Sequence, residues 1–121
     1  MRDFKKFNIW NNAMDIVVST YQLTKRLPSE EKFGLVSQMC RAAVSIPSNI
    51  AEGCSRNSEV EFKRFLEIAL GSSFELETQI LICERLGFFS KDEIEKQIVF
   101  LNELQKQINS LVTKIRDSNN S

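Results

Sequence analysis

The chain has 121 residues, enough for one domain, and its 16 Lys and Arg balance its 16 Asp and Glu, so the formal net charge is zero. Without an overall positive field, binding to nucleic acid or to an anionic membrane would require a local basic patch. The sequence contains no histidine, which excludes Ser-His-Asp and Cys-His catalysis, His-ligated zinc and the Glu-x-x-His di-iron sites of helix bundles. We therefore expect a protein that is not an enzyme, with no catalytic residues, metal ligands or cofactor.

The three cysteines, Cys40, Cys54 and Cys83, show no C-x-x-C spacing and fall in or beside helical apolar patterns. We interpret them as reduced thiols packed as small apolar side chains. The N-terminal residues are charged without a following apolar run, and no apolar run approaches the ~20 residues of a membrane span. The expected location is the cytoplasm, with no membrane segment.

Four segments repeat apolar residues with the helical period. The first helix is predicted over residues 10–26, because Pro28 disfavours helical dihedral angles in the residue before it. Its main apolar stripe is predicted to contain Trp10, Ala13, Met14, Val17 and Tyr21, widened on one side by Ile16, Leu23 and Leu27.

The second helix is predicted over residues 31–53, with Ser29 as its cap and Pro47 inside it. A proline removes one helical hydrogen bond and crowds the preceding turn, so the helix either kinks there or stops and restarts. Apolar residues keep helical spacing across the proline, which favours one helix kinked near Pro47. These apolar residues are Leu35, Met39, Ala42, Ile46 and Ile50.

The third and fourth helices are predicted over residues 58–86 and 91–116. Each begins with a capping box, in which a serine is followed three residues later by a glutamate. These boxes are Ser58 with Glu61 and Ser90 with Glu93, and Gly87 closes the third helix.

Short connections between long helices make sequential neighbours antiparallel. The predicted fold is therefore all-α, a single domain over residues 1–121 built as an antiparallel up-down-up-down four-helix bundle.

A polar stripe accompanies the apolar one on the second helix, at steps of three and four residues. It consists of Gln38, Arg41, Ser45, Asn49, Glu52 and Arg56. The third helix offers Glu75 and Gln79 close to Gly71 and its small neighbours. Three interpretations are open: an ordinary solvated face, a network buried between helices or subunits, and a surface that reads a ligand or phosphate. We favour the network, with Glu75 as the partner of Arg41.

The N-terminal segment alternates basic and aromatic residues, as single-strand binders do. The alternative is that Phe4 and Phe7 simply pack on the bundle. The candidate nucleic-acid contacts of the chain are Lys5, Lys6, Lys63, Arg64 and Arg85.

Several motifs together resemble a bacterial family, the four-helix-bundle proteins encoded in intervening sequences of 23S ribosomal RNA genes. The most specific stretch is RAAVSIPSNIAEG at residues 41–53. The other matching segments are Trp10-x-x-Ala13-Met14, Phe33-Gly34-Leu35-x-x-Gln38, Arg56-x-Ser58-x-x-Glu61-Phe62-x-x-Phe65-Leu66, Ala69-x-Gly71-Ser72 and Glu75-Leu76-Glu77-Thr78-Gln79.

The resemblance implies a four-helix bundle that associates into a ring, most simply a homopentamer, without known enzymatic activity. The family is related to the accessory protein of diversity-generating retroelements, whose ring is a basic barrel that binds nucleic acid and partners a reverse transcriptase. This chain departs from that pattern at Cys40, where the family usually has a second arginine, and in its zero net charge. Both departures weaken the nucleic-acid interpretation and leave the ring unaffected.

Two functional classes remain open on the sequence. One is a ring-forming module that binds RNA or DNA through its summed Lys and Arg. The other is a structural scaffold, or a scaffold for a protein partner, with no role in nucleic-acid binding.

Overall fold

The computed structural model describes residues 2–120, and these contain four α-helices, two short 3-10 helices and no strand. In chain order the elements are η1 (Phe4–Lys6), α1 (Asn8–Thr24), η2 (Ser29–Glu31), α2 (Leu35–Cys54), α3 (Glu59–Arg85) and α4 (Lys91–Asn120). The prediction of an all-α chain with four helices is confirmed. Within this described part, no helix combines the length and the apolar character that crossing a bilayer demands.

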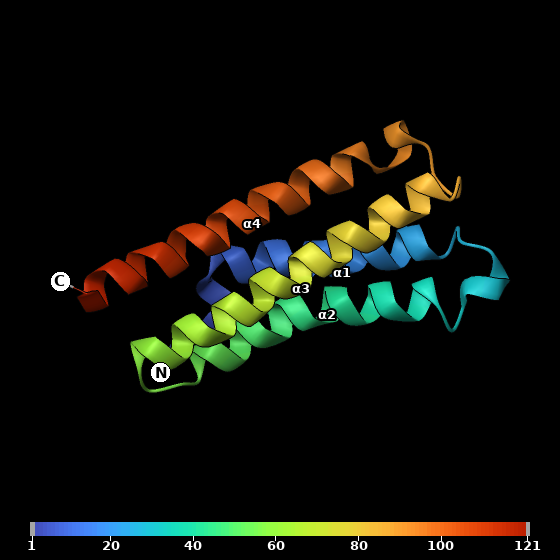
Figure 1. The fold of residues 1–121 in the computed structure, drawn as a ribbon. Coiled ribbons are helices and arrows are strands. Elements are labelled where there is room, and N and C mark those ends of the chain that lie inside the picture. Colours follow the sequence, from blue (N-terminus) through green and yellow to red (C-terminus); the bar gives the residue numbers. More distant parts are fainter. Residues whose placement is uncertain (1, 121) are drawn as a thin grey trace.

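The four α-helices lie lengthwise beside one another (Figure 1). The connections at residues 25–34 and 86–90 lie at one end of the molecule, and the turn at residues 55–58 lies at the other. α2 packs most extensively on α3, α1 packs on α2, α3 packs on α4, and the seam between α1 and α4 is the thinnest. α1 and α3 are therefore diagonal neighbours, with their outer faces on different sides of the bundle.

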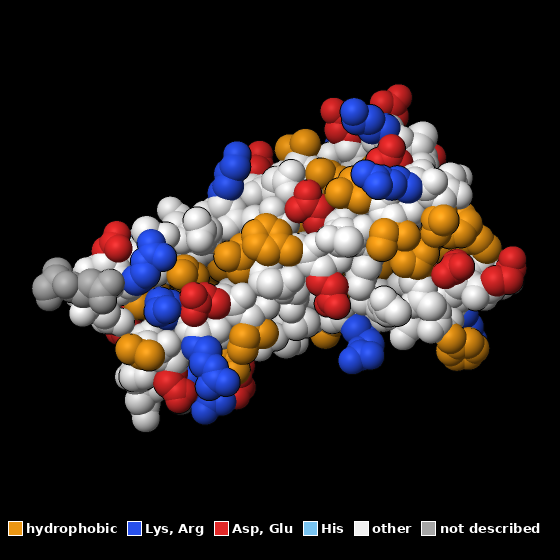
Figure 2. Space-filling view, in the orientation of Figure 1, with side chains coloured by type: hydrophobic (Ala, Val, Ile, Leu, Met, Phe, Trp, Pro, Cys, Tyr) orange, Lys and Arg blue, Asp and Glu red, His pale blue; other side chains and the backbone are white. Residues whose placement is uncertain are grey.

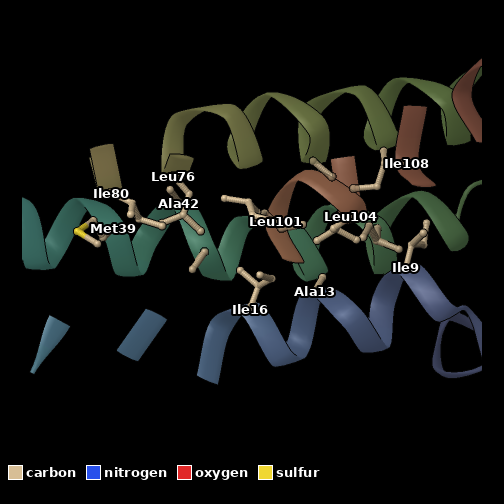
Figure 3. Close-up of a cluster of buried hydrophobic side chains, with 14 of the residues drawn as sticks. Ile9, Ala13, Ile16, Met39, Ala42, Leu76, Ile80, Leu101, Leu104 and Ile108 are labelled. Atoms are coloured by element: carbon tan, nitrogen blue, oxygen red, sulfur yellow. The ribbon is translucent and has the colours of Figure 1, made fainter. Parts of the chain in front are cut away.

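The core is a continuous column of aliphatic side chains contributed by all four α-helices (Figure 3). Its largest fully buried members include Ile16, Met39, Ile46, Leu76 and Leu104. Burial of such side chains removes apolar surface from water, which is the largest favourable contribution to folding.

The predicted core stripe of the first helix was partly wrong. Ala13 is fully buried, but Met14 and Tyr21 are exposed, and Trp10 and Val17 are only half-buried. The residues of α1 that face the core are Ile9, Ala13, Ile16, Thr20, Leu23 and Thr24, so the inner face lies on the side where Ile16 and Leu23 were predicted to widen the stripe. α1 is apolar over so much of its circumference that spacing alone did not distinguish the inner face from the outer one.

The predicted start of the second helix was also too early, since α2 begins at Leu35 and residues 29–31 form η2. Gly34 interrupts the helical path because its φ of −105° and ψ of −108° are not helical. Glu31 bridges this break, because its carboxylate accepts a hydrogen bond from the Leu35 N–H at 3.3 Å. α2 continues through Pro47 without stopping.

The start of α4 is fixed by a complete capping box. The Glu93 N–H donates to Ser90 Oγ at 3.2 Å, and the Ser90 N–H donates to Glu93 Oε1 at 2.7 Å. The Ser90 backbone N–H, with Arg26 and the Ser90 hydroxyl, lowers the pKa of the Glu93 carboxyl. Gly87, with a φ of 81°, ends α3 and lets the chain reverse in this short connection.

Truncation of one central side chain tests this assignment of the core. We expect Leu76→Ala, at a fully buried position, to lower the free energy of unfolding by about 2–5 kcal/mol in urea denaturation. Leu86→Ala is the matched control, because Leu86 is 58% exposed, and its effect should stay within about 0.5 kcal/mol. Equal losses in the two variants would contradict the assignment.

Candidate functional site

The middle of the polar stripe forms hydrogen bonds at the junction of α2 and α3. Ser45 Oγ lies 2.8 Å from Ser72 Oγ, which links the two helices directly. The Asn49 amide donates to Ser45 O at 2.8 Å and to Ser45 Oγ at 2.9 Å. All three side chains are half-buried, so this part of the stripe is a network between helices within one chain.

The N-terminal part of the stripe faces outward beside an open pocket of about 330 Å³ on the α2–α3 surface. The lining residues are Gln38, Arg41, Ala42, Ser45 and Glu75. Arg41 and Glu75 share this pocket and are both exposed, but they form no ion pair with each other in the described chain. The arginine therefore lacks the partner expected for it within one copy.

The C-terminal part of the stripe is anchored. Arg56 Nη2 lies 2.5 Å from Glu52 Oε1 one turn earlier, and the guanidinium stacks 4.8 Å from the centre of the Phe65 ring. Arg2 donates to the Arg56 carbonyl oxygen at 3.1 Å, which fastens the N-terminal segment to the α2–α3 turn.

Gln79 is buried on α3, one turn after Glu75, with 6% of its surface exposed. Its Oε1 has no hydrogen-bond donor among the described residues. A buried acceptor without a donor carries the cost of its lost hydration, so the hydrogen-bonding capacity of Gln79 is not fully used within the described part of the chain.

The N-terminal aromatic residues pack on the bundle. The Phe4 and Trp10 rings are 5.1 Å apart between centres, and those of Phe7 and Phe62 are 6.1 Å apart. Both pairs meet edge to face, a favourable geometry for aromatic rings. Phe4 and Phe7 are therefore occupied by packing within the chain.

The candidate basic residues do not form one cluster. Lys5 and Lys6 belong to η1, and Lys63 and Arg64 belong to the first turns of α3, near the α2–α3 turn. Arg85 lies at the opposite end of α3, about 33 Å away for a rise of 1.5 Å per residue. Lys63 is also partly neutralised, because its Nζ lies 3.3 Å from Glu67 Oε1.

The family model for the 23S rRNA-intervening sequence protein matches residues 5–110 of the chain. The chain belongs to this family. The resemblance seen in the sequence motifs is thereby confirmed, and the match includes the whole polar stripe and the α2–α3 pocket.

One solved structure is similar to this member of the 23S rRNA-intervening sequence family. It is a crystal structure of a protein of unknown function from the S23 ribosomal protein family of Bacteroides thetaiotaomicron. The two chains are 26% identical, with a TM-score of 0.80 over 86% of this chain and 97% of that one. Comparison with curated proteins gives no match.

A second network of polar side chains joins α3 to α4 in this family member. The sequence patterns did not predict it. Glu77 Oε1 accepts hydrogen bonds from Asn102 Nδ2 at 3.0 Å and from Gln105 Nε2 at 2.9 Å. Gln105 Oε1 in turn accepts from Asn102 at 3.0 Å. The available signal was that Asn102 and Gln105 directly follow Leu101 and Leu104, so they flank the apolar stripe of α4.

The described residues of this family member present charged and amide side chains at the surface of α2 and α3. They contain no group of three or more side chains suited to hold a metal ion. Burial raises the pKa of the Cys54 and Cys83 thiols, which disfavours the nucleophilic thiolate. What remains at the surface is a set of guanidinium, carboxylate and amide groups along α2 and α3.

The link between α2 and α3 can be tested by a double-mutant cycle on Ser45→Ala and Ser72→Ala. Because the two hydroxyls bond each other, the losses in unfolding free energy should be non-additive by about 1 kcal/mol. The control pair is Ser45→Ala with Ser110→Ala, which lies on an exposed part of α4 and should be additive. If the losses in unfolding free energy were additive in both pairs, the hydrogen bond between Ser45 and Ser72 would have no stabilising role.

Proposed function

We propose that this protein is a cytoplasmic, non-catalytic module that self-associates through the outer face of α2 and α3. The observation that carries this proposal is the pocket between these helices, where Arg41 and Glu75 lie exposed without pairing to each other. A neighbouring copy that covered this face would supply partners for both charges and for the amide of Gln38.

Apolar side chains on the same face support an interface made with a protein. Val44, Ile68 and Ile82 are each about two-fifths exposed, at 40%, 41% and 41%. On the face shown in Figure 2, acidic, basic and apolar side chains are interspersed and form no field of one sign. Apolar groups among complementary charges are typical of protein–protein contacts.

The ring of five copies is the part of the proposal that rests on the resemblance to the family. A cyclic ring uses a heterologous contact, in which two different faces of the chain meet. No face of a single copy then has to match itself, so the outer faces of the copy can differ in polarity.

Each copy in this proposal is an antiparallel up-down-up-down bundle whose second helix bends near Pro47. Paired hydrogen bonds between α1 and α4 support the antiparallel order, since Asn12 bonds Gln107 and Thr20 bonds Gln97. A bend is expected because proline removes one hydrogen bond from the helix that it interrupts.

Light scattering on the purified chain tests the proposal directly. We expect a mass of several copies, five in the ring, and a lower mass or melting temperature for Arg41→Ala, which removes the unpaired guanidinium. Lys114→Ala, at an exposed position on α4, is the control and should leave both values unchanged. A monomer at all concentrations would overturn the proposal.

Nucleic-acid binding is the second candidate, favoured by the grouping of four basic residues at one end of the molecule. These residues are Lys5, Lys6, Lys63 and Arg64. In a ring of parallel copies, these ends would share one rim and their charges would add. The acidic residues in the same region, Glu59, Glu61 and Glu67, oppose such binding.

A titration of RNA and DNA at two salt concentrations distinguishes the candidates. If contacts to phosphates carry the binding, a plot of log affinity against log salt concentration should fall with a slope of about −0.9 for each phosphate neutralised on duplex DNA. If nucleic acid binds at this rim, Lys5→Glu with Lys6→Glu should reduce that slope, and Lys114→Glu should not. Absence of binding at low salt would leave the scaffold, with or without a protein partner.

A further inference from the structure

One line of exposed residues follows the outside of α1. We call it the α1 row, and it consists of Asp15, Val18 and Gln22 with Lys25, the residue that caps the C-terminus of α1 in a helical conformation. Steps of three and four residues place these side chains on one face of the helix. Val18 is 56% exposed, and neither Asp15 nor Lys25 forms an ion pair in the described part of the chain.

A second line follows the outside of α3 with the same kind of spacing. This α3 row consists of Arg64, Ile68, Gly71 and Glu75. Its two terminal charges are also unpaired among the described residues, and Ile68 is 41% exposed. The α3 row therefore presents one apolar side chain between two opposite charges, as the α1 row does.

Gly71 leaves an open place in the α3 row. A Cβ atom at this position would meet no heavy atom within 4 Å, so packing inside the chain does not require glycine here. Glycine in a helix interior is less favourable than alanine, because its backbone loses more conformational freedom. The absence of a side chain at Gly71 allows a second helix to approach the backbone of α3 closely at this point.

The two rows are complementary in charge. At 1.5 Å per residue, the charges of the α1 row are about 15 Å apart and those of the α3 row about 17 Å apart. The order along the chain is acidic then basic in α1, and basic then acidic in α3. Parallel alignment therefore brings Asp15 to Arg64 and Lys25 to Glu75, with Val18 beside Ile68.

We propose that the α1 row of one copy docks in parallel on the α3 row of the next copy. This inference rests on the proposed self-association and names the two surfaces that meet. α1 and α3 run in the same direction in Figure 1 and do not pack on each other, so one copy can use both outer faces at once. Such a head-to-tail contact is heterologous and generates a closed ring when the rotation between copies closes.

Charge reversal tests the pairing, with light scattering over a range of concentrations. Asp15→Arg and Arg64→Asp should each weaken association by about tenfold or more, since each places like charges together. The double variant restores opposite charges and should recover much of the loss. Lys114→Glu, an exposed reversal on α4 outside both rows, is the control.

A bulky side chain at position 71 provides an independent test of the contact. Gly71→Leu meets open space in its own chain, so circular dichroism should show an intact helical fold. The mass in light scattering should nevertheless fall, because the added side chain keeps the next copy away. Ser110→Leu on the exposed face of α4 should leave the mass unchanged.

The outcomes separate this inference from the proposal on which it rests. A wild-type assembly whose mass is unaffected by Asp15→Arg, Arg64→Asp and Gly71→Leu would overturn the docking of the two rows and leave self-association standing. A wild-type chain that stays monomeric would overturn both. Reduced mass in either reversal without recovery in the double variant would refute the specific pairing of Asp15 with Arg64.

Discussion

The close approach of α2 to α3 is the constraint on which the rest of the structure depends. A Cβ atom at Gly53 would lie 2.9 Å from Phe65 Cβ and 3.1 Å from Phe62 Cδ1, so the two helices meet with no room for a methyl group. The Ser45–Ser72 hydrogen bond marks another point where small side chains allow direct contact across this pair. Protein interiors are packed so densely that such contacts fix the relative position of two helices.

This packing also determines which groups are available at the surface. With Ser45 and Asn49 engaged at the junction, Arg41 is left on the outer side, where it shares a pocket with Glu75. The same arrangement leaves Ile68 and Gly71 on the exposed face of α3. A tightly packed helix pair thus positions a surface rich in recognition groups, which is the physical basis for proposing self-association of this family member.

The number and type of the helices were predictable because local chemistry fixes them, as the capping residues Ser58 and Ser90 and the terminator Gly87 illustrate. The orientation of α1 was harder to predict, since its exposed Met14 and Tyr21 look like core residues in a linear pattern. The lack of an ion pair between Arg41 and Glu75 in the described chain, and the hydrogen bonds that join Glu77 to Asn102 and Gln105, depend on how two helices are placed beside each other. Periodicity within one helix carries no information on that placement.

The sign of the stability change in Gly53→Ala tests the central packing claim most directly. Alanine is the better helix former, and the backbone of Gly53 has no positive φ, so without the contact the variant should gain up to about 1 kcal/mol. The structure predicts a loss in the free energy of unfolding measured in urea, because the new methyl group meets Phe62 and Phe65. A variant more stable than the parent chain would contradict the close packing of α2 on α3.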